Sequence, residues 1–226
     1  MVITFLSYKY HFSFNVDLTL LSIAIIFPLV FTIRGSFRRR EKALEHLSEF
    51  RSTLKTLKYF FFSNKNLSED YKNDIESIIN EINTKVLDHL LDKKSNINEL
   101  DKIINKLFIF ISDNNEILPR SLKDKLFRFM KDMHECVENL HAIHMHRTPI
   151  SLKAYCKLFI YVFPAIYAPV VIYNLGELTP NWVAYFIVII TEFILISLYN
   201  IQNQLEFPFD KIGLDDIDLD SFKINR

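Results

Sequence analysis

The fold is decided by the stretch Leu18-Thr-Leu-Leu-Ser-Ile-Ala-Ile-Ile-Phe-Pro-Leu-Val-Phe-Thr-Ile-Arg-Gly-Ser-Phe-Arg-Arg-Arg40. Residues 18–33 carry no charge, and the aromatic residues before them extend the run to about twenty residues, enough to cross a hydrocarbon layer about 30 Å thick. Arginines follow immediately, and basic residues mark the cytoplasmic end of a membrane helix. The stretch therefore predicts a transmembrane helix over residues 17–34 with its C-terminal end in the cytosol.

One stripe of this helix carries Ile23, Phe27 and Phe31, which are spaced i, i+4, i+8 and therefore share a face. In a ring of subunits, three such apolar rings would form a pore neck that gates by dewetting. From spacing alone, a lipid-facing or helix-packing stripe is the simpler interpretation. Ile25 and Leu29, on the other side of the helix, are expected to face lipid.

The basic cluster after this helix has two interpretations. It could raise the anion concentration in a cytosolic vestibule, or it could be only the topology signal that any membrane protein carries at this position. Both stay open for its members Arg34, Arg38, Arg39 and Arg40.

A second apolar unit is predicted over residues 151–203 as a transmembrane helical hairpin. Tyr155–Leu175 rises, residues 176–180 turn, and Trp182–Tyr199 returns. Trp182 fits the aromatic belt at a membrane surface. The basic residues before the rising helix again favour a cytoplasmic base: Arg147, Lys153 and Lys157.

The average composition hides this segregation. The chain is 50% hydrophobic and 24% charged with net charge +0, yet its charges gather between the two apolar units. We therefore predict an all-α, multi-pass membrane protein that contacts lipid, with a cytosolic helical domain over residues 35–150 and a cytosolic C-terminus. Its remaining segments are an aromatic N-terminal strand or loop (1–16), helices at 36–62, 71–93, 97–112 and 121–146, and an acidic tail (204–226).

Several function classes are disfavoured. The chain has no long basic patch with interleaved aromatics, so no nucleic-acid partner is expected. Neither a nucleophile–base pair nor a metal-ligand spacing emerges, which disfavours an enzyme, and no cofactor is expected. Cys136 and Cys156 have no redox spacing and are typical of a reduced environment.

Three motifs resemble the bestrophin family, most closely its prokaryotic branch. Pro149-Ile-Ser-Leu-Lys-Ala-Tyr155 is similar to the family's "Pro-(Ile/Leu)-x-x-x-Tyr" before the hairpin, with one residue more. Gln204-Leu-Glu-Phe-Pro-Phe209 is similar to "Gln/Glu-Leu-x-x-Pro-Phe" before the acidic residues. Phe31-Thr-Ile-Arg-Gly-Ser-Phe37 is similar to the end of the family's pore helix. The resemblance covers about residues 16–58 and 118–222.

This resemblance implies a homopentameric channel for chloride or other small ions. It assigns the pore neck to Ile23, Phe27 and Phe31, and a second cytosolic aperture to Ser121 or Leu122. Family members have a further membrane helix before the pore helix, so residues 1–14 are expected to replace it or the chain to be a shortened relative. A non-conducting membrane scaffold and a cation-selective channel are the alternatives.

The acidic tail resembles the calcium clasp of animal family members, where carboxylates supply hard oxygen ligands. The candidate calcium ligands are Asp215, Asp216 and Asp218. The calcium-free prokaryotic pattern fits this chain better, and an acidic segment packed on a neighbour's basic helix is the preferred interpretation.

Two further features, a group of histidines and a carboxylate within a membrane helix, are expected to interact with other groups. His141 and His144 share a helix face and could hold zinc with a third ligand, although a solvated helix that also carries His134 and His146 is the simpler interpretation. A pH-sensing role is a further alternative. Glu192 is a carboxylate within the returning membrane helix, where such groups usually face protein or water.

Overall fold

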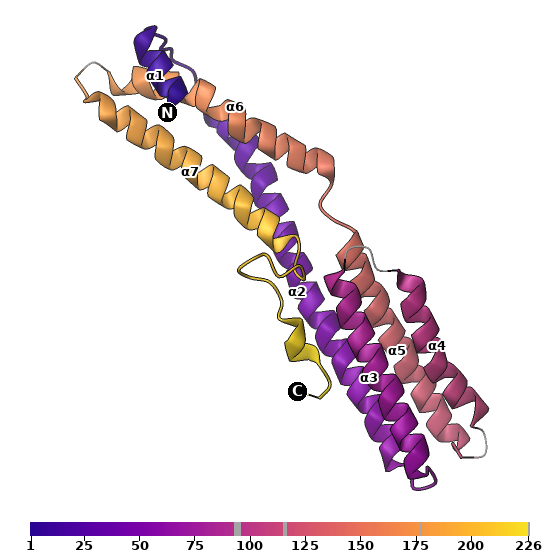
Figure 1. The fold of residues 1–226 in the computed structure, drawn as a ribbon. Coiled ribbons are helices and arrows are strands. Elements are labelled where there is room, and N and C mark those ends of the chain that lie inside the picture. Colours follow the sequence, from indigo (N-terminus) through magenta and orange to yellow (C-terminus); the bar gives the residue numbers. More distant parts are fainter. Residues whose placement is uncertain (93–95, 115–116, 177, 226) are drawn as a thin grey trace. The chain divides into compact units, whose positions relative to one another are not determined.

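The computed structural model describes residues 1–92, 96–114, 117–176 and 178–225, and Figure 1 shows them as a ribbon. Their regular structure is helical throughout, so the predicted all-α class is confirmed. Residue 177 of the predicted hairpin turn lies outside the described residues. The helices are α1 (Val2–Lys9), α2 (Thr19–Ser63), α3 (Glu69–Leu91), α4 (Ile97–Asp113), α5 (Arg120–Met145), α6 (Ile150–Leu175), α7 (Asn181–Leu205) and the short 3-10 helix η1 (Leu219–Phe222).

The helix α2 runs without a break through Pro28 and Gly35, so the predicted apolar and amphipathic helices are one element. The prediction of a strand or loop over residues 1–16 is wrong for Val2–Lys9, which is helical, whereas residues 10–18 belong to no helix. Tertiary packing explains the difference: Ile3 and Tyr8 pack against the buried residues Ala168 and Ala184 of the hairpin. Such burial stabilises a short helix that local sequence alone would leave marginal.

The chain folds as two compact units, which are described separately. Unit 1 comprises Met1–Arg38 and Thr148–Glu206, and unit 2 comprises Arg39–Arg147 and Phe207–Arg226.

In unit 1, the helices α6 and α7 contact each other and form the predicted hairpin (Figure 1). The first part of α2 packs on them through Ile25 and Leu29, which are 2% and 1% exposed and join Cys156, Ile160 and Leu195 in one cluster. The expectation that Ile25 and Leu29 face lipid is therefore wrong. Sequence periodicity identifies a helix face, but it does not say what covers that face.

Three helical segments are long and apolar enough to cross a membrane. They lie within Thr19–Ser63, within Arg120–Leu175, which ends with α6, and within Asn181–Leu205. Their apolar windows are only partly buried inside the protein, as expected for helices whose remaining surface faces lipid or other subunits.

Unit 2 is a helical bundle built from residues 39–63 of α2 together with α3, α4 and α5 (Figure 1). Its core includes a stripe of α2 that is fully buried: Leu47, Phe50, Leu54, Leu57 and Phe61. The C-terminal segment closes this bundle, because Phe209, Ile217, Leu219 and Ile224 are buried in the same core. Asn83 of α3 fixes the segment by donating to Phe222 O at 3.3 Å and accepting from Ile224 N at 3.2 Å.

Candidate functional site

The predicted pore stripe is exposed on unit 1. Ile23, Phe27 and Phe31 are 43%, 55% and 62% exposed, and the two phenylalanine rings stack with centroids 6.2 Å apart. Apolar side chains of this size are usually covered, either by protein, by lipid or by another subunit. Since Ile25 and Leu29 are buried on the opposite side of α2, the stripe belongs to the exposed surface of this helix that such a partner could cover, together with Ile26 and Val30.

The four arginines after this stripe divide into two pairs. Arg34 and Arg38 are exposed and lie seven residues after Phe27 and Phe31, which is about two helical turns. They therefore continue the face of the apolar stripe. Arg39 and Arg40 instead make contacts within unit 2: Arg39 Nη1 donates to His146 O, and Arg40 Nε donates to Asp215 O at 2.6 Å.

The predicted aperture residues lie at the start of α5. Ser121 is exposed, whereas Leu122 is half-buried and packs on the core of the bundle. A single subunit therefore presents only Ser121 freely at this position.

The three aspartates proposed as calcium ligands are engaged in local turns of the tail. Asp216 accepts from Gly213 N at 3.0 Å, and Asp218 caps η1 by accepting from Asp220 N at 3.1 Å. Asp215 contributes its backbone carbonyl to Arg40. Burial raises the pKa of Asp216, and the neighbouring Asp210 adds to this effect. In the preferred interpretation the tail packs on a neighbouring subunit; here it packs on its own bundle.

The base of the hairpin holds a polar network that the sequence did not indicate. The Glu206 carboxylate is 1% exposed and accepts from Thr148 N at 3.0 Å, Lys153 Nζ at 2.5 Å and Gln202 Nε2 at 3.1 Å. A buried carboxylate is tolerated only when it is paired in this way. The network ties the beginning of α6 to the end of α7.

The histidines of α5 meet a third histidine that sequence spacing could not reveal. His89 of α3 is buried, with its Nε2 2.9 Å from His141 Nδ1 and its ring centroid 5.6 Å from that of His144. The pKa of His89 is lowered to about 4, chiefly by burial. The neighbouring His141 and His144 contribute to this lowering, and Asp92 opposes it. The cluster therefore favours a neutral imidazole at His89.

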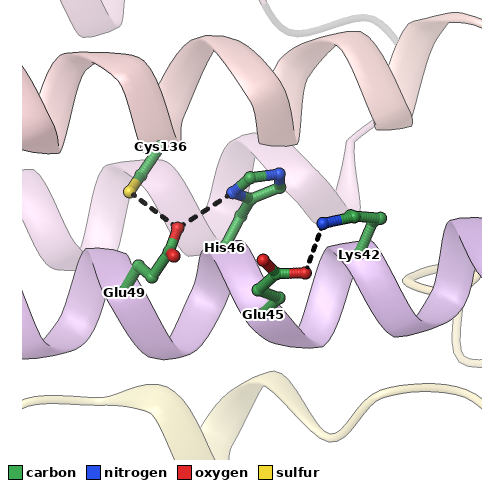
Figure 2. A network of polar contacts seen from close by, with 5 residues as sticks. All are labelled: Lys42, Glu45, His46, Glu49 and Cys136. Carbon is green, nitrogen blue, oxygen red and sulfur yellow. Dashed lines mark hydrogen bonds and ion pairs between the residues drawn. The ribbon is translucent and has the colours of Figure 1, made fainter.

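A second polar cluster joins α2 to α5 (Figure 2). His46 Nδ1 lies 3.1 Å from the Glu49 carboxylate, and the Cys136 thiol donates to the same oxygen at 3.7 Å. Burial and the adjacent Glu49 carboxylate raise the pKa of Cys136 to about 12, so the thiol is protonated in this state. The spacing His46-x-x-Glu49 was visible in the sequence, but nothing there paired it with Cys136.

Two other residues from the sequence analysis have defined surroundings. His134 lies with Asp101 and Glu138 in a cluster whose ligand atoms are within 4.8 Å of one another, but both acids are exposed. Glu192 of α7 has a buried Oε2 for which no hydrogen-bond partner is found within the described residues.

No family model matches the chain, and no curated protein matches its sequence. Solved structures do match. A bacterial bestrophin homologue from Klebsiella pneumoniae, carrying a mutation, aligns with TM-score 0.81 at 15% identity over 99% of this chain and 91% of that chain. A second mutant of that homologue aligns with TM-score 0.82 over the same shares. This chain has the bestrophin fold. A crystal structure described as a membrane protein also aligns, with TM-score 0.83 at 15% identity.

The bestrophin fold confirms the resemblance read from the motifs around residues 31–37, 149–155 and 204–209. The alignment extends over 99% of the chain, so it also includes the polar helices α3 and α4. In these helices the sequence carries no motif that resembles the family. The chain is accordingly an all-α membrane protein of bestrophin-like architecture.

Proposed function

We propose that the chain is the subunit of a bestrophin-like ion channel whose pore is lined by α2. The observation that carries this proposal is the exposed stripe of Ile23, Phe27 and Phe31, which continues into Arg34 and Arg38 on the same face. One helix cannot enclose an aqueous path, so the stripe requires a ring of subunits. By analogy with the resemblance to bestrophins, we propose a homopentamer.

The proposed neck is apolar and blocks ions when it is dry, because a narrow dry segment cannot replace an ion's hydration shell. The proposed conducted ion is chloride or another small anion. Phenylalanine edges carry partial positive charge, and the exposed arginines raise the local anion concentration at one end of the stripe.

The proposed topology places residues 35–150 and the C-terminus in the cytosol, because basic residues flank both membrane units on that side. A cysteine placed at Asn64 should be protected from an impermeant thiol reagent added outside, whereas one at Leu178 should be labelled. Cys136 and Cys156 are buried and give little background. The reverse labelling would remove the proposed orientation of the pore.

The deciding experiment compares two matched triple variants in reconstituted bilayers. Replacing Ile23, Phe27 and Phe31 with Ala should widen and wet the neck, raising single-channel conductance and weakening gating. The control triple on α7 has the same side chains at nearly the same exposure, namely Phe186 at 57%, Ile190 at 44% and Phe193 at 67%. Truncating the control triple should leave the conductance unchanged.

Other outcomes would favour the alternatives. Equal effects from both triples would make the stripe an ordinary packing surface. A stable monomer by native mass measurement, with no current from the unmodified protein, would favour a non-conducting scaffold. Reversal potentials in asymmetric NaCl separate an anion channel from a cation channel, and replacing Arg34 and Arg38 with Gln should lower the anion preference.

A further inference from the structure

We propose that His46, Glu49 and Cys136 form a binding site for a zinc-class divalent transition-metal ion within unit 2. This site is separate from the proposed pore stripe and does not depend on channel activity. Figure 2 shows the three side chains meeting between α2 and α5.

The geometry of the donor atoms is close to that of a bound zinc ion. One nitrogen of His46, one carboxylate oxygen of Glu49 and the Cys136 sulfur all lie within 4.8 Å of one another. Tetrahedral zinc, with bonds of about 2.0–2.3 Å, holds its ligand atoms roughly 3.5 Å apart. The separations of 3.1 Å from nitrogen to oxygen and 3.7 Å from sulfur to oxygen already fall near that value.

The helix α2 places two of the ligands without strain. His46 and Glu49 are three residues apart, which sets them on the same face of a helix. Cys136 comes from the facing helix α5 and is 5% exposed, so its position is fixed by packing. The metal would therefore join two helices that the bundle already holds together.

The chemistry of the donors selects the class of ion. One sulfur, one nitrogen and one oxygen suit zinc or cobalt, whereas calcium and magnesium require mostly oxygen ligands. Binding releases the thiol proton to solvent, because a coordinating cysteine is a thiolate. In the metal-bound state the neutral imidazole of His46 carries its proton on Nε2, so that Nδ1 is free to bind the metal.

Glu49 is available for this role. The neighbouring cation Lys42 pairs with Glu45 at 2.6 Å, one turn before the cluster. Within the part of the chain that the structure describes, the Glu49 carboxylate contacts the His46 ring and the Cys136 thiol, and a metal ion would replace both contacts.

The cluster is accessible and leaves room for a fourth ligand. It opens onto a cavity of about 550 Å³ that Asp132 and Glu135 also line. Their carboxylates favour the approach of a cation. With three protein ligands, the fourth position can hold water from this cavity, as in open zinc sites.

The test uses cobalt as a spectroscopic probe of the full-length protein in detergent. Titration with Co²⁺ should produce a thiolate-to-cobalt charge-transfer band that saturates at one ion per chain and disappears when Zn²⁺ is added. Cys136→Ser should abolish this band. Glu49→Gln should weaken cobalt binding by more than about 10-fold, the lower end of what even an indirect metal contact contributes.

Two variants serve as matched controls. Cys156→Ser removes the other cysteine, and Glu45→Gln removes the carboxylate one turn earlier on α2; both should keep the band and the affinity. Glu49 is 53% exposed, so Glu49→Gln retains the fold and decides the question even if Cys136→Ser does not fold. No band in the unmodified protein, an unchanged affinity in Glu49→Gln, or loss of the band in Cys156→Ser would overturn the proposal.

Discussion

The two parts of α2 carry similar apolar stripes, but one stripe is buried and the other is exposed. In residues 39–63, the stripe through Leu47, Phe50 and Leu54 is 0% exposed. In residues 19–38, Phe27 and Phe31 are more than half exposed, although the helix continues unbroken. The difference lies in what surrounds the helix: α3, α5 and the C-terminal segment complete the bundle of unit 2, whereas the hairpin of unit 1 covers only the side with Ile25 and Leu29.

This contrast predicts that the buried stripe stabilises the fold, whereas the exposed stripe serves conduction in the proposed channel. A buried apolar side chain contributes roughly 1.5–3 kcal/mol to folding by leaving water, and its loss adds a cavity term. An exposed side chain contributes little to the fold of one subunit. Mutations in the two parts of α2 should therefore separate into those that unfold the protein and those that alter its conduction.

The largest effect is expected in the buried part. Phe50→Ala should lower the free energy of unfolding by about 3–5 kcal/mol, because it opens a cavity in a fully packed core. Phe27→Ala, the same chemical change at an exposed position, should alter it by less than about 0.5 kcal/mol. Chemical unfolding in detergent, followed by circular dichroism, measures both. Similar losses at the two positions would contradict the contrast.

The next prediction concerns residues 19–38 of α2, on the side of the helix that is buried against the hairpin. Leu29→Ala should cost roughly 2–5 kcal/mol, because Leu29 is 1% exposed within the cluster shared with α6 and α7. Val30→Ala, at the adjacent position that is 49% exposed, is the matched control and should be nearly neutral. The same unfolding assay applies. If Leu29→Ala were neutral too, α2 would not pack on the hairpin as described.

Lowering the pH should have an intermediate effect, and it should act on the stability of the helical bundle in unit 2. The pKa of His89 is lowered to about 4 in the folded state, against 6.5 ordinarily, so the unfolded chain takes up a proton first as the pH falls. Stability should be unaffected above about pH 6.5 and should fall between pH 6.5 and 4, by up to roughly 3 kcal/mol. Urea unfolding at several pH values measures this slope. His89→Gln should flatten it, whereas the exposed His146→Gln should not.

The smallest effect concerns the glycine between the two stripes. Gly35 lies in the helix interior, and a Cβ there would meet no other atom within 4 Å. Gly35→Ala should therefore stabilise the protein by about 0.5–1 kcal/mol through the lower entropy of the unfolded chain. The unfolding midpoint should rise while the conductance stays unchanged. A lower midpoint would mean that the position needs a conformation that alanine does not adopt.

The sequence predicted most helices well, because apolar periodicity is a local signal. The predicted helix at 97–112 corresponds to Ile97–Asp113, and that at 121–146 corresponds to Arg120–Met145. It failed at Val2–Lys9, where the alternation of aromatic residues suggested a strand and packing against the hairpin makes a helix. Local patterns cannot report such long-range contacts.

In the candidate sites too, local patterns predicted which residues share a helix face, whereas contacts made by tertiary packing were missed. Periodicity placed Ile23, Phe27 and Phe31 on one face, but it could not tell which face the hairpin covers, and so the environment of Ile25 and Leu29 was wrongly predicted. The polar clusters were missed for a related reason: His89 meets His141 across 52 residues, and Glu49 meets Cys136 across 87. Only the packing of α3 and α2 against α5 brings these side chains together.

The chain leaves unit 2 at Arg147 and returns to it at Phe207, and these two residues touch, with the guanidinium carbon 4.2 Å from the centre of the ring. The whole hairpin is thus an insertion between two adjacent points of the bundle. A short glycine-rich linker from Arg147 to Phe207, with the chain begun at Arg39, should give a water-soluble helical domain with its C-terminal segment still docked. Such a domain would allow the histidine and cysteine clusters to be studied by solution NMR, free of detergent.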